Sequence, residues 1–137
     1  MKRKRYASSK PHEGHLGAVR ARRIGERVLI GGVAPVSARG KPVAIDDPYG
    51  QMWRCIQLLE EALEAFDAAL ADVVSTRIYL VQRDDWSAVA RAHADAFDEI
   101  KPVTTMVVVK GLLDPLWRVE MEAEAVLPTV PPAPPMG

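Results

Sequence analysis

The sequence has little cysteine, few aromatic residues and no long apolar run. Cys55 is the single cysteine among 137 residues, so no disulfide can form within the chain. No apolar stretch approaches the roughly 20 residues that span a bilayer, and the basic start of the chain is not followed by the apolar segment of a signal peptide. We therefore expect no transmembrane helix, no disulfide framework and a location in the reducing cytoplasm.

Motifs typical of metalloenzymes, of phosphate-binding enzymes and of enzymes with a catalytic serine or cysteine are also missing. His12, His15 and His93 lack the ligand spacing of a zinc site, and no Cys/His cluster accompanies them. The sequence contains neither a phosphate-binding glycine loop nor a serine in a Gly-x-Ser-x-Gly elbow. We expect no bound metal and no cofactor.

What the chain does have is enough apolar sequence for one core, since 48% of its residues are hydrophobic and its length is typical of a single domain. We place this domain at residues 11–127. The proline-rich segment 128–137 cannot form a regular hydrogen-bond ladder and is expected to be an extended tail. Residues 1–10 form a basic arm that is expected to lack regular structure. Such an arm can attract phosphates or can simply be solvated.

Apolar periodicity predicts the order strand, strand, helix, strand, helix, strand, strand. Gly25-Glu26 is a short turn between two alternating segments, which is typical of a hairpin. From Pro48 apolar residues recur every three or four positions, as in an amphipathic helix. A second helix is expected after Asp84-Asp85, whose carboxylates are suited to capping, and its packed stripe is Trp86, Val89, His93, Ala96/Phe97 and Ile100.

The remaining expected elements are strands at 72–81, 104–109 and 117–127, the strand at 104–109 being buried. In the strand at 72–81 one face is expected to carry Val74, Thr76, Ile78 and Leu80, and the other Val73, Ser75, Arg77, Tyr79 and Val81.

This order predicts an α+β fold in which two helices cover one face of a mixed sheet. The strands at 73–81 and 104–109 carry apolar or β-branched residues on both faces, and one helical layer cannot cover all of them. Self-association would cover the second face. The alternative is that these are ordinary scattered surface residues.

Several separated segments resemble the Rid/YjgF family, the reactive-intermediate deaminases that also include proteins called L-PSP endoribonucleases. The matching segments lie at 17–20, 25–32, 72–80, 91–93, 102–109 and 119–125. The resemblance implies a chorismate-mutase-like fold, a homotrimeric barrel with helices outside, and a cleft between neighbouring subunits. It also implies hydrolysis of reactive enamines and imines without a cofactor.

The resemblance indicates which residues form the site. Glu120 matches the family glutamate that handles the hydrolytic water, although by its spacing it could equally lie on a solvated strand face. The family arginine that grips a substrate carboxylate is replaced here by Thr104, which favours an altered substrate. The other candidate substrate-binding residues are Gly31, Gly32, His15, Trp117 and Tyr79.

Trp117 and His93 leave alternatives open. Trp117 could wall a pocket against an aromatic ligand, or could only close the core. His93 lies on the apolar stripe of the second helix, which favours a packed or subunit-facing histidine over a catalytic one.

Three functions follow as hypotheses. The first is hydrolysis, by deamination, of a reactive enamine, imine or related small nitrogenous metabolite. The second is a trimer that binds a small molecule or protects other proteins without turnover. The third is RNA cleavage, which the basic arm supports modestly while no group suited to activating a ribose hydroxyl is evident. We expect self-association as a homotrimer and a small-molecule ligand, either a carboxylate or an aromatic compound. We expect no nucleic-acid partner and no membrane partner.

Overall fold

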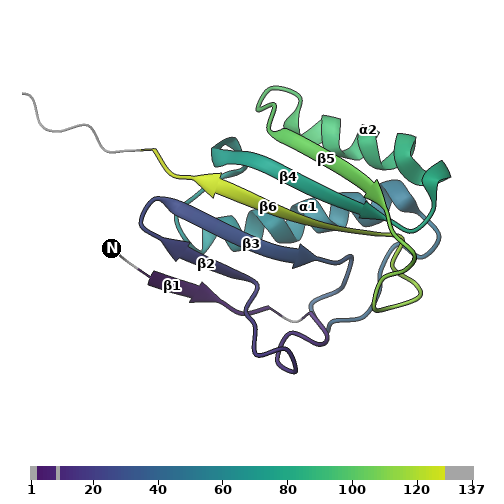
Figure 1. Cartoon of the computed structure of the whole chain (residues 1–137), viewed down its shortest axis with the longest axis horizontal. Coiled ribbons are helices and arrows are strands. Elements are labelled where there is room, and N and C mark those ends of the chain that lie inside the picture. Colours follow the sequence, from purple (N-terminus) through teal and green to yellow (C-terminus); the bar gives the residue numbers. More distant parts are fainter. Residues whose placement is uncertain (1–2, 9, 129–137) are drawn as a thin grey trace, which may run out of the picture.

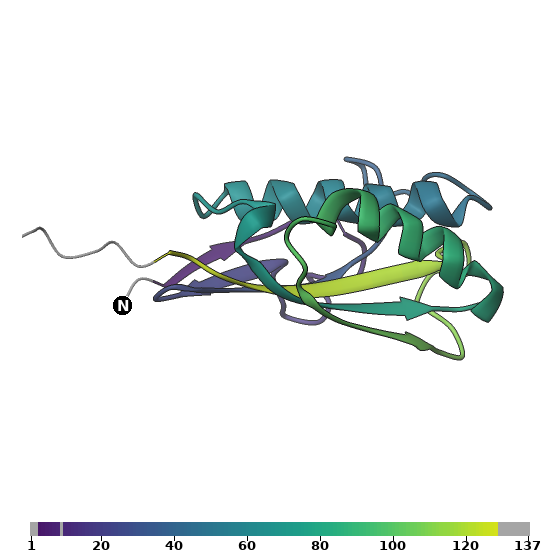
Figure 2. The same cartoon turned by 90° about the horizontal axis from the view of Figure 1, so that it is seen from above.

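The computed structural model describes residues 3–8 and 10–128. These residues form a mixed six-stranded sheet with two α-helices on one face (Figures 1 and 2). The strand order is β1-β2-β3-β6-β4-β5, and only the pair β4 and β5 is parallel. The elements are β1 (Arg3–Tyr6), β2 (Ala21–Ile24), β3 (Arg27–Val33), α1 (Pro48–Glu64), β4 (Val73–Leu80), α2 (Trp86–Phe97), β5 (Val103–Val108) and β6 (Val119–Val126). The predicted α+β class and the placing of both helices on one face are confirmed.

The predicted hairpin is formed by β2 and β3, with Gly25 at φ 61° supplying the left-handed turn residue. The start of the chain differs from the prediction. Arg3–Tyr6 form strand β1, which pairs antiparallel with β2, so this part of the basic arm is ordered against the sheet. Of the proline-rich tail, residues 129–137 lie outside the described residues.

Helix α1 begins at the predicted residue, Pro48, because Asp47 caps it and proline tolerates the first helical position. The Asp47 carboxylate accepts a hydrogen bond from the Gly50 amide at 2.9 Å. One face of α1 packs on the sheet and includes Met52, Cys55 and Leu59, none of which is exposed. Together with β3, β4, β6 and α2 this face forms one continuous apolar core.

Side chains of strand β4 alternate between the two faces of the sheet as expected, except at the start of the strand. Val73 is buried and Val74 is exposed, the reverse of the expected alternation. The cause is an irregularity in the pairing with β6 between Val73 and Ser75, which shifts the side-chain alternation by one residue. From Thr76 onward the alternation follows the prediction.

Two expectations for the second helix are wrong. Asp85 does not cap α2 with its side chain; its carboxylate instead binds Arg118. Trp86 is 57% exposed although it was expected on the packed stripe, and Val89, Ala92 and Phe97 fill the core from this helix. Trp86 is the first residue of the helix, one turn before the stripe reaches the core.

Strand β5 is an edge strand, not the buried strand that its composition predicts. Val103 is 76% exposed, and Val107 and Val108 are also exposed, because β5 has β4 on one side only. The open face of the sheet, opposite the helices, carries Leu29 as a further exposed apolar residue.

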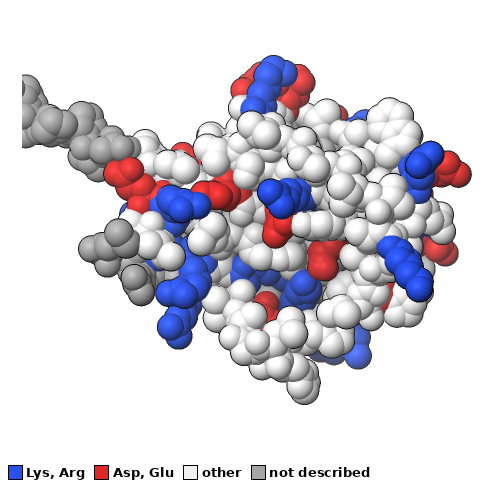
Figure 3. Space-filling model, in the orientation of Figure 1, with Lys and Arg blue, Asp and Glu red and all other residues white. Residues whose placement is uncertain are grey.

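Charged side chains are scattered over this face, with lysine and arginine gathered toward β1 and β2 (Figure 3). No helix in the described part of the chain is long and apolar enough to cross a membrane.

Candidate functional site

The candidate catalytic residue Glu120 lies near the start of β6 and forms an ion pair with Lys10. The Lys10 Nζ atom is 3.1 Å from Glu120 Oε2 and also donates to the Gly32 carbonyl oxygen at 2.6 Å. The two side chains are only 16% and 14% exposed. Glu120 is therefore a partly buried, charge-compensated carboxylate and not a freely solvated residue of the strand face.

Gly32 makes room for this ion pair. The pairing of β3 with β6 shifts between Ile30 and Val33, so the two glycines lie at an irregularity in the ladder. A Cβ atom at Gly32 would lie 2.9 Å from Glu120 Oε2 and 3.1 Å from Lys10 Nζ. Any larger residue at this position would displace the carboxylate or the ammonium group.

Trp117 lies next to the ion pair and is almost completely buried. Its ring centroid is 5.8 Å from Lys10 Nζ, within the range of a cation–π interaction. The ring of His12 meets the same indole edge-on, with centroids 6.4 Å apart. Trp117 is therefore part of the core, and its ring also contacts Lys10 of the ion pair.

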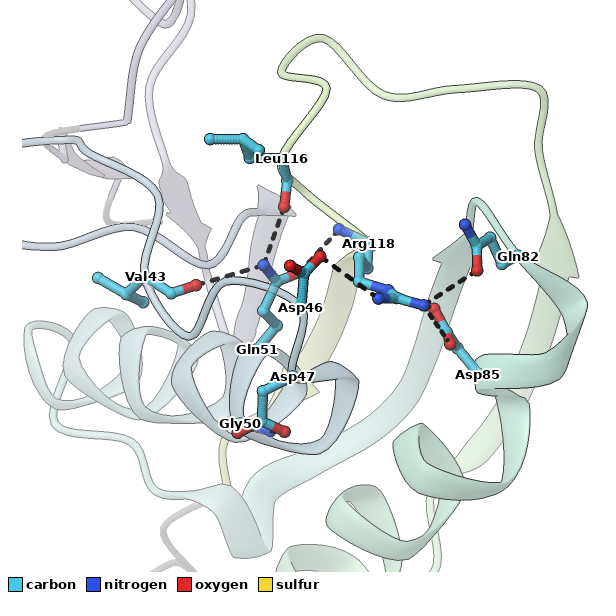
Figure 4. Close-up of polar contacts among 9 residues, drawn as sticks. All are labelled: Val43, Asp46, Asp47, Gly50, Gln51, Gln82, Asp85, Leu116 and Arg118. Carbon is cyan, nitrogen blue, oxygen red and sulfur yellow. Dashed lines mark hydrogen bonds and ion pairs between the residues drawn. The ribbon is translucent and has the colours of Figure 1, made fainter.

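Gln51 fixes the backbone on both sides of Trp117 (Figure 4). Its Nε2 donates to the Leu116 carbonyl at 2.9 Å and to the Val43 carbonyl at 3.2 Å, while its Oε1 accepts from the Arg118 amide at 2.7 Å. Gln51 comes from α1 and is fully buried, so it ties the segment that leads into β6 to a rigid helix.

Arg118 extends the same network toward α2. Its Nε and Nη2 atoms donate to the two carboxylate oxygens of Asp85 at 2.8 and 2.9 Å, and Nη2 also donates to Gln82 Oε1 (Figure 4). Asp46 lies 3.7 Å away on the other side of the guanidinium. The hydrogen bonds with Asp85 raise the pKa of Arg118, so the guanidinium stays charged at any physiological pH.

A cavity of about 140 Å³ opens beside the ion pair. Lys10, His12, Glu13, Arg20, Gly31 and Gly32 line it, with apolar walls from Leu16, Val19 and Leu113. Arg20 is only 3% exposed. Burial lowers the pKa of Arg20, and the charges of Glu13 and Glu120 oppose this shift. The lining of the cavity therefore includes two cationic side chains, Lys10 and Arg20, and one carboxylate, Glu13.

The structure brings four of the predicted site residues together and separates three from them. Gly31, Gly32, Trp117 and Glu120 lie around the ion pair or the cavity. Tyr79 pairs with Glu120 across the strands, but its hydroxyl donates to Glu122, which raises the pKa of Tyr79. His15 is exposed in the loop before β2 and does not line the cavity.

Thr104 lies elsewhere in the subunit. Its hydroxyl is 2.8 Å from that of Thr76, which in turn is 2.9 Å from His93 Nε2, on the helix side of the sheet. Burial lowers the pKa of His93, and its ring packs against Phe97 with centroids 4.6 Å apart. The packed histidine expected on the stripe of α2 is therefore confirmed.

Sequence reasoning did not single out Lys10, Arg20 or Gln51 as members of the site. Lys10 and Glu120 are 110 positions apart, so no local spacing links them. Gln51 occupies a buried position of an otherwise amphipathic helix, and a polar residue on an apolar stripe is the signal that could have found it. Among the described residues, no group of three or more histidine, cysteine, aspartate or glutamate side chains could hold a metal ion.

Comparison with known proteins decides the family. Residues 13–127 match the family described as Endoribonuclease L-PSP. The chain belongs to this family. It is 35% identical over 123 residues to an uncharacterized protein of Streptomyces coelicolor, covering 89% of this chain and 90% of that protein. A RutC family protein of Pyrococcus abyssi is 28% identical over 103 residues, covering 75% of this chain and 80% of that protein.

Solved structures of other proteins have the same fold. Rv2704 of Mycobacterium tuberculosis, a member of the YjgF/YER057c/UK114 family, superposes with a TM-score of 0.82 at 37% identity and covers 92% of this chain and 100% of that one. Yeast Mmf1 also gives a TM-score of 0.82 at 19% identity, over 93% of this chain and 100% of its own. The predicted resemblance to the Rid/YjgF family and its α+β fold are confirmed.

Proposed function

We propose that this protein hydrolyses the C=N bond of a reactive imine, or of the enamine that tautomerises to it, with Glu120 as the general base. The observation that supports this most is the Glu120 carboxylate itself. It is partly buried, held by Lys10 at 3.1 Å, and next to a cavity, which is the setting in which a carboxylate takes a proton from a bound water. The resemblance to the Rid/YjgF family, which implies hydrolysis of enamines and imines, supports the same role.

The proposed reaction needs one water and one proton acceptor. Glu120 accepts a proton as the water oxygen bonds to the imine carbon, and the C=N electron pair moves to nitrogen, which takes up a proton. The resulting carbinolamine then loses ammonia as its hydroxyl becomes a carbonyl, so imine and water give ketone and ammonia. Lys10 keeps the carboxylate in place and compensates its charge before the proton arrives.

We further propose that the working cleft lies between subunits of a homotrimer. Within one subunit Thr104 lies on the helix side of β5, whereas Glu120 alternates with the core residues Val119 and Met121 and so lies on the other side of the sheet. The two candidate residues can meet only if a second copy contributes one of them. Exposed apolar residues on β5 and on the open sheet face supply a surface for that contact.

The substrate preference is proposed to differ from that of family members with an arginine at the position of Thr104. The Thr104 hydroxyl carries no charge, and it is shared with Thr76 and with the Pro102 carbonyl oxygen at 3.2 Å. It cannot replace a guanidinium that grips both oxygens of a carboxylate. Another group has to hold the substrate.

The test uses imines generated in situ from several amino acids and amines, with the ketone product followed over time. The wild-type chain should accelerate product formation, and Glu120→Gln should lower kcat by about 10²–10⁴-fold, which is the usual contribution of a general base. Glu124→Gln is the matched control, because Glu124 lies on the same strand and pairs with Arg27 at the surface. Decay of every imine at the same rate with and without the protein would overturn the proposal.

Binding without turnover is the second candidate. The observation that favours it is the direct contact between Lys10 and Glu120, which occupies the carboxylate that catalysis would need. A small acid that raises the melting temperature while no product forms from any imine would support binding alone.

RNA cleavage, which the family description names, is the third candidate. Arg5, Arg20 and Arg22 line a surface groove of about 440 Å³ where phosphates could bind. Arg5→Gln with Arg22→Gln should then weaken RNA binding at low salt, and the absence of RNA binding by the wild-type chain would rule this candidate out.

A further inference from the structure

Three side chains form a continuous row of hydrogen bonds on the helix side of the sheet. The His93 Nε2 atom is 2.9 Å from the Thr76 hydroxyl, and the Thr76 hydroxyl is 2.8 Å from that of Thr104. The residues come from α2, β4 and β5, and the parallel pairing of the two strands places Thr76 directly opposite Thr104. An imidazole nitrogen is thereby connected to the Thr104 hydroxyl through one intervening hydroxyl.

Burial changes along this row. Thr76 is 1% exposed, His93 is partly buried, and Thr104 is exposed to solvent. A buried hydroxyl needs a partner inside the protein, and His93 already provides one for Thr76. Thr104 needs no such partner, because water can satisfy an exposed hydroxyl. The contact between the two threonines is therefore not required by burial, and it links an accessible hydroxyl to a partly buried base.

The donors and acceptors of the row are consistent with one direction. Burial lowers the pKa of His93, so the imidazole is neutral at pH 7 and one of its nitrogens is an acceptor. With Nε2 as the acceptor, Thr76 donates to His93 and accepts from Thr104. The other acceptor within reach of the Thr104 proton is the Pro102 carbonyl oxygen at 3.2 Å, which is the longer contact. The Thr104 proton then points along the row toward the base.

A cavity of about 270 Å³ opens at the exposed end of the row, and its lining includes Thr104, His93 and three further residues that suit an acyl group. Phe97 and Pro102 offer apolar contact to a short acyl chain. Lys101 supplies positive charge for a carbonyl oxygen that becomes negative during attack. Its ion pair with Asp98 has a length of 3.6 Å, and the two side chains are 77% and 79% exposed, so this contact is readily exchanged.

We propose that Thr104 is an acyl-acceptor site, at which the hydroxyl attacks the carbonyl carbon of a small activated ester or thioester and becomes acylated. Thr104 Oγ1 bonds to the carbonyl carbon as its proton passes to Thr76 Oγ1 and the Thr76 proton passes to His93 Nε2. The tetrahedral adduct then expels the phenolate or thiolate as the carbonyl re-forms, and the leaving group takes the proton from His93. One acyl group moves from the donor to Thr104, and one proton moves from Thr104 to the leaving group.

In this reaction Thr104 is the residue that bonds to the substrate, and Thr76 and His93 act through it. The reaction does not use Glu120, so it is separate from the proposed imine hydrolysis. The neighbouring hydroxyl of Thr105 provides the matched comparison. Thr105 is also exposed on β5, but side chains alternate along a strand, so it lies on the opposite face from His93.

The test is incubation of the full chain with p-nitrophenyl acetate, followed by the release of p-nitrophenol and by mass spectrometry of the peptide that contains Thr104. The wild-type chain should gain one acetyl group at Thr104. Alkaline hydroxylamine should remove it, because hydroxylamine cleaves an ester but not the amide of an acetylated lysine. Thr104→Val should abolish the label and Thr104→Ser should keep it, while Thr105→Val should be labelled at Thr104 at the wild-type rate.

The pH profile tests the part played by the other two residues. Thr76→Val and His93→Gln should each lower the rate of labelling at pH 7.5 by at least ~10-fold, as expected for loss of a general base. The wild-type rate should be constant above about pH 6.5 and fall below it as His93 takes up a proton, and His93→Gln should lose this dependence. Asp98→Asn, which changes another titratable group of the same cavity, should leave the midpoint of the profile unchanged.

Three results would overturn the inference. The first is acetylation confined to lysine side chains or to the amino terminus. The second is equal labelling of Thr104 in the wild type and in a folded His93→Gln or Thr76→Val variant, with thermal melts showing that the variant is folded. The third is a rate that rises about tenfold per pH unit from pH 5 to pH 8, which would mean attack by hydroxide-generated alkoxide without His93.

Discussion

Gln51 holds both peptide groups that flank Trp117, through hydrogen bonds of 2.9 Å to the Leu116 carbonyl and 2.7 Å from the Arg118 amide. A fully buried side chain of α1 thereby sets the position of the indole that lies beside Lys10. The chain of contacts runs from the helix to the tryptophan, then to the ammonium group and the Glu120 carboxylate. The site is positioned by the core and not by the surface loops alone.

We predict that Gln51→Leu lowers the free energy of unfolding by about 2–4 kcal/mol, because it leaves partly buried backbone groups at Val43, Leu116 and Arg118 without their partner. Urea denaturation monitored by circular dichroism measures this. Gln57→Leu is the control on the exposed side of the same helix and should change stability by no more than about 0.5 kcal/mol. Equal effects of the two substitutions would show that the hydrogen bonds of Gln51 matter little.

We predict that Asp85→Asn destabilises the protein by about 1–3 kcal/mol, because it replaces a charged, two-bond contact with Arg118 by a neutral side chain. Asparagine is as good a helix cap as aspartate, so loss of capping would not explain the effect. Asp84→Asn, at the neighbouring exposed residue, should be nearly neutral. Thermal melts of both variants measure this. A lower melting temperature for Asp85→Asn alone supports the ion pair, and an unchanged one would contradict it.

The sequence predicted the elements whose signal is local and missed features that depend on distant partners. The Gly25 turn and the start of α1 at Pro48 follow from backbone preferences of single residues. The role of Asp85 depends on Arg118, which is 33 residues away in the sequence. The residues around Asp85 indicate a helix cap and do not indicate this ion pair. The exposure of β5 depends on strand order, which apolar composition does not encode.

The pKa of His93 is lowered by burial, so between the folded-state pKa and the ordinary value near 6.5 the unfolded chain binds more protons than the folded one. The contribution of His93 is fully present above pH 6.5 and is lost as the pH falls toward the folded-state pKa. Stability should therefore rise with pH in this window, by at most about 1.4 kcal/mol per pH unit for one proton. The difference between wild type and His93→Gln in urea midpoints from pH 5 to pH 8 isolates this group. An unchanged difference across that range would refute the assignment.

Burial raises the pKa of the Cys55 thiol, and Cys55 is completely enclosed by α1 and the sheet. Since the thiolate is the reactive form, we predict that iodoacetamide leaves native Cys55 unmodified and labels it fully in 6 M guanidinium, as mass spectrometry would show. Labelling in the native state at the rate of a free thiol would mean that α1 separates from the sheet, contrary to the packing described.

For the site, the sequence indicated Glu120 and the two glycines but not what surrounds them. Gly32 matters because of atoms from Lys10 and Glu120, which approach it only after β3 and β6 pair. Arg20 is one of several arginines in a basic segment, and nothing local distinguishes the buried one from exposed Arg5. Burial of a charge is a property of the fold, so the structure was needed to find it.

The account depends on a site completed by a second copy of the chain, and the molar mass in solution tests this most directly. Light scattering on the full chain at micromolar concentration should give three times the mass of one chain, because the exposed apolar residues of β5 and the open sheet face would then be covered. A stable monomer across that concentration range would contradict the account, since Thr104 and Glu120 could not then form one site.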